Sequence, residues 1–144
     1  MRQILLFTLL LGLQQFTNLA SAFIDPNSAK SETAVLRCYV SYADQTEIID
    51  TFPQSSGYET KPVDIGGRFT FKAVMIGQAK KLEHIALYAY FQANPKDLPI
   101  HEAIYRGPFK LNNRPTLITP YNHLYAGEVE RELKYHCELF KVKQ

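Results

Sequence analysis

Four histidines are the side chains best suited to binding a transition metal: His84, His101, His123 and His136. Imidazole is a common ligand of copper and zinc, and one site can draw its ligands from different strands. No two of these residues have the H-x-H, H-x-x-x-H or C-x-x-C spacing of a local metal motif. The sequence therefore leaves a periplasmic copper- or zinc-handling protein as an alternative. The simpler interpretation is four scattered surface histidines without a ligand role.

Cys38 and Cys137 are the two cysteines of the chain. An even number of cysteines in an exported protein predicts a disulfide, because oxidising compartments keep such pairs bridged. A free thiol pair, an intermolecular bridge and a metal site remain as alternatives. Both cysteines fall on the apolar faces of predicted strands that lie far apart in the sequence, so we expect the bridge to join two sheets.

Catalysis has little support in the sequence. The chain lacks G-x-S-x-G, and neither cysteine lies in a signature that would expose it beside a base. Glu130, Glu132 and Glu138 share one face of a predicted strand with Lys134, where solvent rather than a cleft surrounds them. We therefore expect no catalytic residues and no cofactor, and a binding or structural role.

Tyrosines suggest where such binding would occur. Tyr39, Tyr88 and Tyr90 fall at outward positions of predicted strands. A tyrosine combines a flat apolar ring with a polar tip, which suits recognition of a protein or a carbohydrate. We expect a binding face built from these tyrosines, or from loops at residues 54–61 and 121–127. The competing interpretation is that sheets tolerate tyrosine readily and that other segments cover these rings.

Residues 1–22 have the features of a cleavable secretory signal peptide. Arg2 is followed by an apolar run at residues 4–13 and by the small-residue site Ala20-Ser21-Ala22. The run is about half of the roughly 20 residues needed to cross a bilayer, so no membrane anchor is expected in the mature protein. The sequence thus predicts export to the periplasm or the extracellular space.

Removal of the signal from the 144-residue chain leaves 122 residues and lowers the net charge from +2 to +1. This length suits one domain, expected at residues 34–144 behind a flexible leader at 23–33. The low and evenly mixed charge lacks the concentrated basic face that nucleic-acid binding requires. We therefore expect no nucleic-acid partner.

Period-two alternation of apolar residues predicts strands separated by Gly, Pro and Asn turns. Residues 128–139 also fit a helix in part, but Tyr135, Cys137 and Phe140 favour a strand over residues 128–142. The inward-facing residues Phe69, Phe71, Leu87, Phe91, Leu133 and Leu139 are expected in the core. The remaining strands are expected at residues 34–42, 47–52, 68–76, 82–92, 101–106 and 116–119, with 109–111 as an extension of the fifth.

About seven short strands predict an all-β fold, an antiparallel β-sandwich. Tyr135-His136-Cys137 also resembles the Tyr-x-Cys of the immunoglobulin tyrosine corner, in which the tyrosine precedes the second bridging cysteine by two residues. The chain has no tryptophan to pack on the bridge, and 99 positions separate its cysteines. The resemblance therefore implies an immunoglobulin-like architecture only, and no function.

Overall fold

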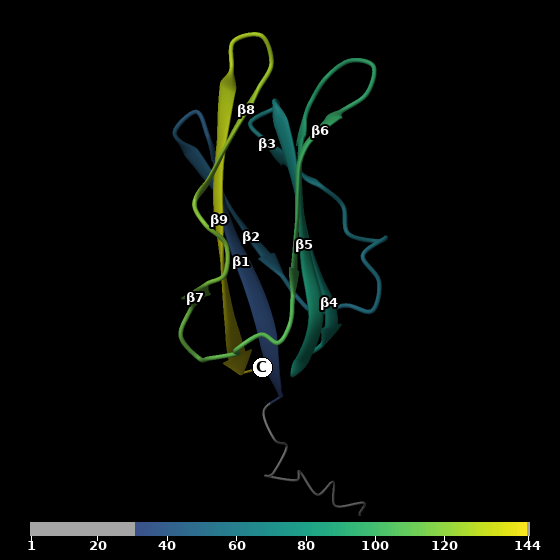
Figure 1. The fold of residues 1–144 in the computed structure, drawn as a ribbon, viewed down its shortest axis with the longest axis vertical. Helices are drawn as coiled ribbons and strands as arrows, with labels where there is room; N and C mark the ends of the chain where they lie inside the picture. The colour runs from purple at the N-terminus through teal and green to yellow at the C-terminus, as the bar shows by residue number, and fades with distance from the viewer. Residues whose placement is uncertain (1–30, 144) are drawn as a thin grey trace, which may run out of the picture.

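The computed structural model describes residues 31–143, which form two packed sheets (Figure 1). The predicted signal peptide and residues 23–30 of the predicted leader lie outside these residues. No helix forms within residues 31–143, so none there is long and apolar enough to cross a membrane. The strands are β1 (Glu32–Tyr42), β2 (Gln45–Thr51), β3 (Val63–Ile65), β4 (Phe69–Gln78), β5 (Lys81–Phe91), β6 (Leu98–Arg106), β7 (Thr116–Leu117), β8 (Asn122–Ala126) and β9 (Arg131–Lys143).

The two sheets are built from separate parts of the chain. One sheet has the order β2-β1-β9-β7, with β8 also paired to β9, and the other is the consecutive meander β3-β4-β5-β6. All strand pairs are antiparallel. The predicted antiparallel β-sandwich is confirmed, with nine strands instead of about seven because β3 and β8 are additional. Residues 122–126, expected within a loop, form β8, and residues 109–111 form no strand.

The C-terminal segment is a strand, and the helical alternative is wrong. β9 pairs with β1 from Ser41↔Lys134 to Glu32↔Lys143. Because side chains alternate along a strand, every second residue of β9 faces the opposite sheet. Tyr135, Cys137 and Leu139 are accordingly buried. β1 begins at Glu32, inside the segment expected to be a flexible leader.

The core lies between the sheets. Phe69, Phe71 and Leu87 from the meander face Leu133 and Leu139 from β9, and none of these five has any exposed surface. The sixth expected core residue, Phe91, is only partly buried and packs edge-on against Phe69 at a ring-centroid distance of 5.6 Å. Five of the six core predictions are thus confirmed fully, and Phe91 lies at the margin of the core.

The disulfide links neighbouring strands of one sheet, not the two sheets. Cys38 on β1 and Cys137 on β9 are direct cross-strand partners, with Cα atoms 4.1 Å apart. The backbone of Cys137 bonds away from β1, since its N–H donates to Thr119 Oγ1 and its C=O accepts from the N–H of Ile118. The two cysteines therefore form a non-hydrogen-bonded pair, in which side chains approach most closely. The expectation of a bridge between sheets was wrong because adjacent strands also present inward-facing side chains to each other.

Tyr135 does not form an immunoglobulin tyrosine corner. Its hydroxyl hydrogen-bonds to His101 Nε2 on β6 at 2.7 Å, and its ring contacts Phe71 at a centroid distance of 5.0 Å. A tyrosine corner would direct the hydroxyl to a backbone group a few residues upstream. Tyr135 instead crosses the core and connects the two sheets.

Candidate functional site

The predicted tyrosine face divides between the two outer surfaces of the sandwich. Tyr88 and Tyr90 lie on the outer face of β5 in the meander, whereas Tyr39 lies on the outer face of β1 in the other sheet. Alternation identifies a side chain that points outward, but a sandwich has two outward directions. The three tyrosines therefore do not share one face, and only Tyr88 and Tyr90 lie together.

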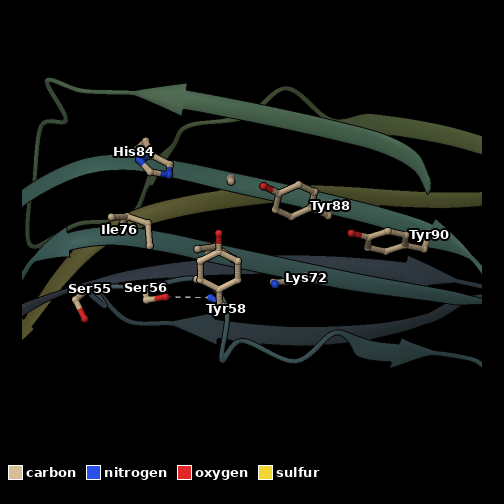
Figure 2. A pocket seen from close by; sticks show the side chains of 11 residues that line it. Ser55, Ser56, Tyr58, Lys72, Ile76, His84, Tyr88 and Tyr90 are labelled. Carbon is tan, nitrogen blue, oxygen red and sulfur yellow. Dashed lines mark hydrogen bonds between the residues drawn. The ribbon is translucent and has the colours of Figure 1, made fainter. Parts of the chain in front are cut away.

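A groove of about 500 Å³ lies on the outer face of the meander, between β4, β5 and the loop at residues 55–58 (Figure 2). Val74 and Ala86, which are cross-strand partners, form its floor. They are only 5% and 3% exposed although both occupy outward positions. Tyr88 and Tyr90 border the groove on β5, and Tyr58 stands on the loop side with 98% of its surface exposed.

The loop is held against the sheet by residues on both sides of it. The N–H of Gln54 donates to the carbonyl of Met75 at 3.0 Å, and the carbonyl of Gln54 accepts from Gly77 at 3.1 Å. The side chain of Gln54 also donates to Thr60 Oγ1, which closes the loop at its base. These contacts attach the chain leaving β2 to the edge of β4, so that the intervening residues fold over the outer face.

Gly57 lets the loop approach the floor of the groove. A Cβ atom at this position would lie 2.7 Å from Val74 Cγ1, closer than real side chains approach each other. Glycine is therefore required here by the contact with the sheet. This contact is also what buries Val74, and it gives the groove its second wall.

The groove presents both rings and hydrogen-bonding groups. Figure 2 shows the hydroxyls of Tyr88 and Tyr90 directed toward the end of the groove where His84 lies. Burial raises the pKa of Tyr88, and the neighbouring Glu102 and Tyr90 raise it further, so its hydroxyl stays protonated at neutral pH and can donate a hydrogen bond. Tyr88 lies between Lys72 on β4 and Glu102 on β6 in the strand register, which places one charge of each sign beside it.

This arrangement suits binding. An apolar ligand surface can stack on the tyrosine rings while its polar edge exchanges hydrogen bonds with tyrosine, serine, lysine and histidine groups. The oxygen of Ser56 already accepts a hydrogen bond from the N–H of Tyr58 at 3.3 Å, which orders the loop beside the groove.

The structure places the four histidines apart. His84 lines the groove, and His101 faces the core. His123 hydrogen-bonds through Nδ1 to Glu132 at 2.7 Å. His136 stacks on Tyr39 and makes a tilted ring contact with Tyr121 on the outer face of the other sheet. Within residues 31–143, no three His, Cys, Asp or Glu side chains come together in a way that could hold a metal ion. The four predicted ligands therefore do not form one site.

Comparisons with protein-family models, with curated proteins and with solved structures return no match for this chain. Lys72, Val74, Ile76 and Ala86 are groove residues that the sequence did not single out, and Tyr58 was included only as part of a loop. The loop at residues 54–61 was expected as a separate binding element, and the structure places it beside Tyr88 and Tyr90. A sequence signal was present in Val74 and Ala86, since apolar residues at outward positions of two paired strands indicate that another segment covers them.

Proposed function

We propose that this chain is an exported, non-catalytic binding module whose ligand occupies the groove on the outer face of the meander. The observation that carries the proposal is the position of Tyr88, Tyr90 and Tyr58 around one hollow with an apolar floor. Tyr58 is exposed and Tyr88 and Tyr90 are partly buried. A ligand that stacks on these rings would remove their remaining apolar surface from water, which favours binding.

The dimensions and chemistry favour a saccharide over a protein partner. A volume of about 500 Å³ falls within the range of small-ligand sites, roughly 300–1,000 Å³. A stable protein interface buries about 800 Å² on each partner, so a protein partner would have to contact the sheet well beyond the residues that line the groove. The hydroxyls of Tyr88, Tyr90 and Ser55 suit a ligand rich in hydroxyl groups, and the rings suit the apolar C–H face of a sugar.

Two features support export. The bridge between Cys38 and Cys137 is typical of proteins that mature in an oxidising compartment. Residues 1–22 have the sequence pattern of a secretory signal. Together they support a periplasmic or extracellular location for the binding module.

A panel of neutral oligosaccharides tests the proposal: chito-, cello-, xylo- and malto-oligomers. The chain has nine tyrosines and no tryptophan, so intrinsic tyrosine fluorescence reports binding directly. Replacement of Tyr88→Ser together with Tyr90→Ser should weaken binding of an oligomer at least about 30-fold, the effect of losing an aromatic anchor worth about 2 kcal/mol. The matched control replaces Tyr121→Ser and Tyr125→Ser on the other sheet, which are exposed and should leave binding unchanged.

A second variant distinguishes a binding role of Tyr88 and Tyr90 from a purely structural one. Gly57→Val should push the loop away from Val74 and weaken binding while the two sheets remain intact. Unfolding of the Tyr88→Ser, Tyr90→Ser protein together with normal binding by Gly57→Val would show that the tyrosines are structural and that the groove is not the site. If no oligosaccharide of the panel binds, the saccharide proposal fails and a protein partner becomes the better hypothesis.

A further inference from the structure

Charge is unevenly distributed between the two ends of the sandwich. β4 and β9 finish at one end, β1 and β5 begin there, and the connection from β6 to β7 crosses it (Figure 1). We call this the basic end, because its strand ends and connections carry seven cationic side chains against the two carboxylates Glu32 and Glu83. The cations are Lys80, Lys81, Arg106, Lys110, Arg114, Lys141 and Lys143.

Contacts confirm that these cations lie together although they come from three parts of the chain. Lys80, Lys81 and Arg106 line one hollow of about 450 Å³. Lys141 pairs with Glu32 at 2.8 Å, and the pKa of Glu32 is lowered by Lys141 and, more weakly, by Lys143 and Lys80. The connection that carries Lys110 joins the group, because the N–H of Lys141 donates to the carbonyl of Asn112 at 2.8 Å.

The opposite end is acidic. It is formed by the turns between β1 and β2, β3 and β4, β5 and β6, and β8 and β9 (Figure 1). These turns and their immediate flanks carry more carboxylates than cations: Asp44, Asp64, Asp97, Glu128 and Glu130 against Arg68, Lys96 and Arg131. A net charge near zero therefore conceals a molecule with two poles of opposite sign.

We propose that the basic end docks on a surface of anionic phospholipid headgroups. The cations are mostly lysines, which bind as point charges and lack the planar fork of arginine that grips one phosphate. They are spread over the end of the sandwich and almost all are exposed, so they suit a delocalised negative surface better than a single enclosed anion.

The length of the strands makes the two poles act independently. The 11 residues of β1 span roughly 35 Å at about 3.3 Å per residue. The Debye length at physiological salt is only about 8 Å. A negative bilayer therefore attracts the basic end without repelling the acidic end. The strands then run roughly perpendicular to the bilayer surface. The groove on the outer face of the meander then opens sideways into solvent, although docking does not depend on what the groove binds.

Co-sedimentation of the exported protein with lipid vesicles tests this proposal. The protein is expected to bind vesicles of phosphatidylglycerol mixed with phosphatidylcholine and not to bind vesicles of pure phosphatidylcholine. Binding should weaken as the salt concentration of the assay is raised from about 25 to about 150 mM, because added salt screens the attraction between charges. Each lysine near an anionic surface contributes about fivefold to binding, so Lys80→Ala with Lys81→Ala should weaken it about 25-fold. Arg106→Gln with Lys110→Gln, on the other connection, should give a similar loss.

The matched control replaces Lys61→Ala and Lys96→Ala, two exposed lysines away from the basic end, and changes the net charge equally. This variant should bind as the unsubstituted protein does. An equal loss in the control would overturn the proposal, because net charge alone would then explain binding. Absence of binding to the phosphatidylglycerol vesicles would also overturn it, as would binding only to free inorganic phosphate or soluble polyphosphate.

Discussion

Removal of the disulfide should destabilise the protein mainly through its unfolded state. The bridge connects residues 99 positions apart, and a closed loop of about 100 residues corresponds to roughly 4.7 kcal/mol of unfolded-state entropy at 25 °C. Replacement of Cys38→Ala and Cys137→Ala should therefore lower the free energy of unfolding by about 4–5 kcal/mol. The two buried sulfur atoms add a packing loss on the order of 1 kcal/mol.

The native fold should survive this change. β1 and β9 remain paired from Ser41↔Lys134 to Glu32↔Lys143, so the bridge is not needed to align them. A domain of this size has about 5–15 kcal/mol of stability. A total loss of about 5–6 kcal/mol leaves the variant folded at 25 °C in all but the lowest part of that range, with a melting temperature lower by about 20 °C.

Urea unfolding followed by tyrosine fluorescence measures the effect. The oxidised protein, the reduced protein and the double alanine variant are compared, and addition of reductant to the alanine variant serves as the control. The dependence of the free energy of unfolding on urea concentration should become steeper when the bridge is absent, because an unfolded chain without the bridge exposes more surface to solvent. A loss below about 1 kcal/mol with an unchanged slope would refute the entropic reasoning. A dimer on a non-reducing gel would show that the bridge forms between molecules.

Two further predictions concern the core. Phe71→Ala should lower the free energy of unfolding by about 3–5 kcal/mol in the same urea assay, because the ring is fully buried against Tyr135. A loss below about 1 kcal/mol would contradict the assignment of Phe71 to the buried face of β4. Burial lowers the pKa of His101, so the folded protein holds it neutral while the unfolded chain takes up a proton below its ordinary value of 6.5. The free energy of unfolding should therefore fall as the pH drops below 6.5, by at most about 1.4 kcal/mol per pH unit. His101→Gln should remove this pH-dependent loss of stability, whereas the control His84→Gln should still show it.

Alternation along single strands was enough to predict the fold class and most of the core. It succeeded for β4 and β5, where Phe69, Phe71 and Leu87 recur at every second position on the buried side. It could not assign a strand to a sheet, because inward and outward are defined relative to a layer that the sequence does not specify. This is why Cys38 and Cys137 were expected to bridge two sheets, and why Tyr39 was grouped with the tyrosines of β5.

The groove could be predicted only in its parts. Tyr88, Tyr90 and the loop at residues 54–61 were each identified from local patterns, but their proximity depends on the attachment of Gln54 beside Met75 and Gly77. That contact joins residues more than twenty positions apart through backbone hydrogen bonds. Because almost every residue type carries the same backbone groups, no residue pattern in the sequence identifies it. The buried outward pair Val74 and Ala86 was the one local sign that a segment covers this face.

The two charged ends, in contrast, follow from the sequence once the strands are known. In an antiparallel meander each connection lies at the opposite end from the one before it. The turn between β4 and β5 contains Lys80, and Lys81 follows it directly, whereas the turns at the opposite end contain Asp44, Asp97, Glu128 and Glu130 against Arg68 and Lys96. Sorting the connections by their alternating position therefore separates basic from acidic turns, although the summed charge of the chain is close to zero. Composition alone hides this polarity because it adds charges that the strands hold far apart.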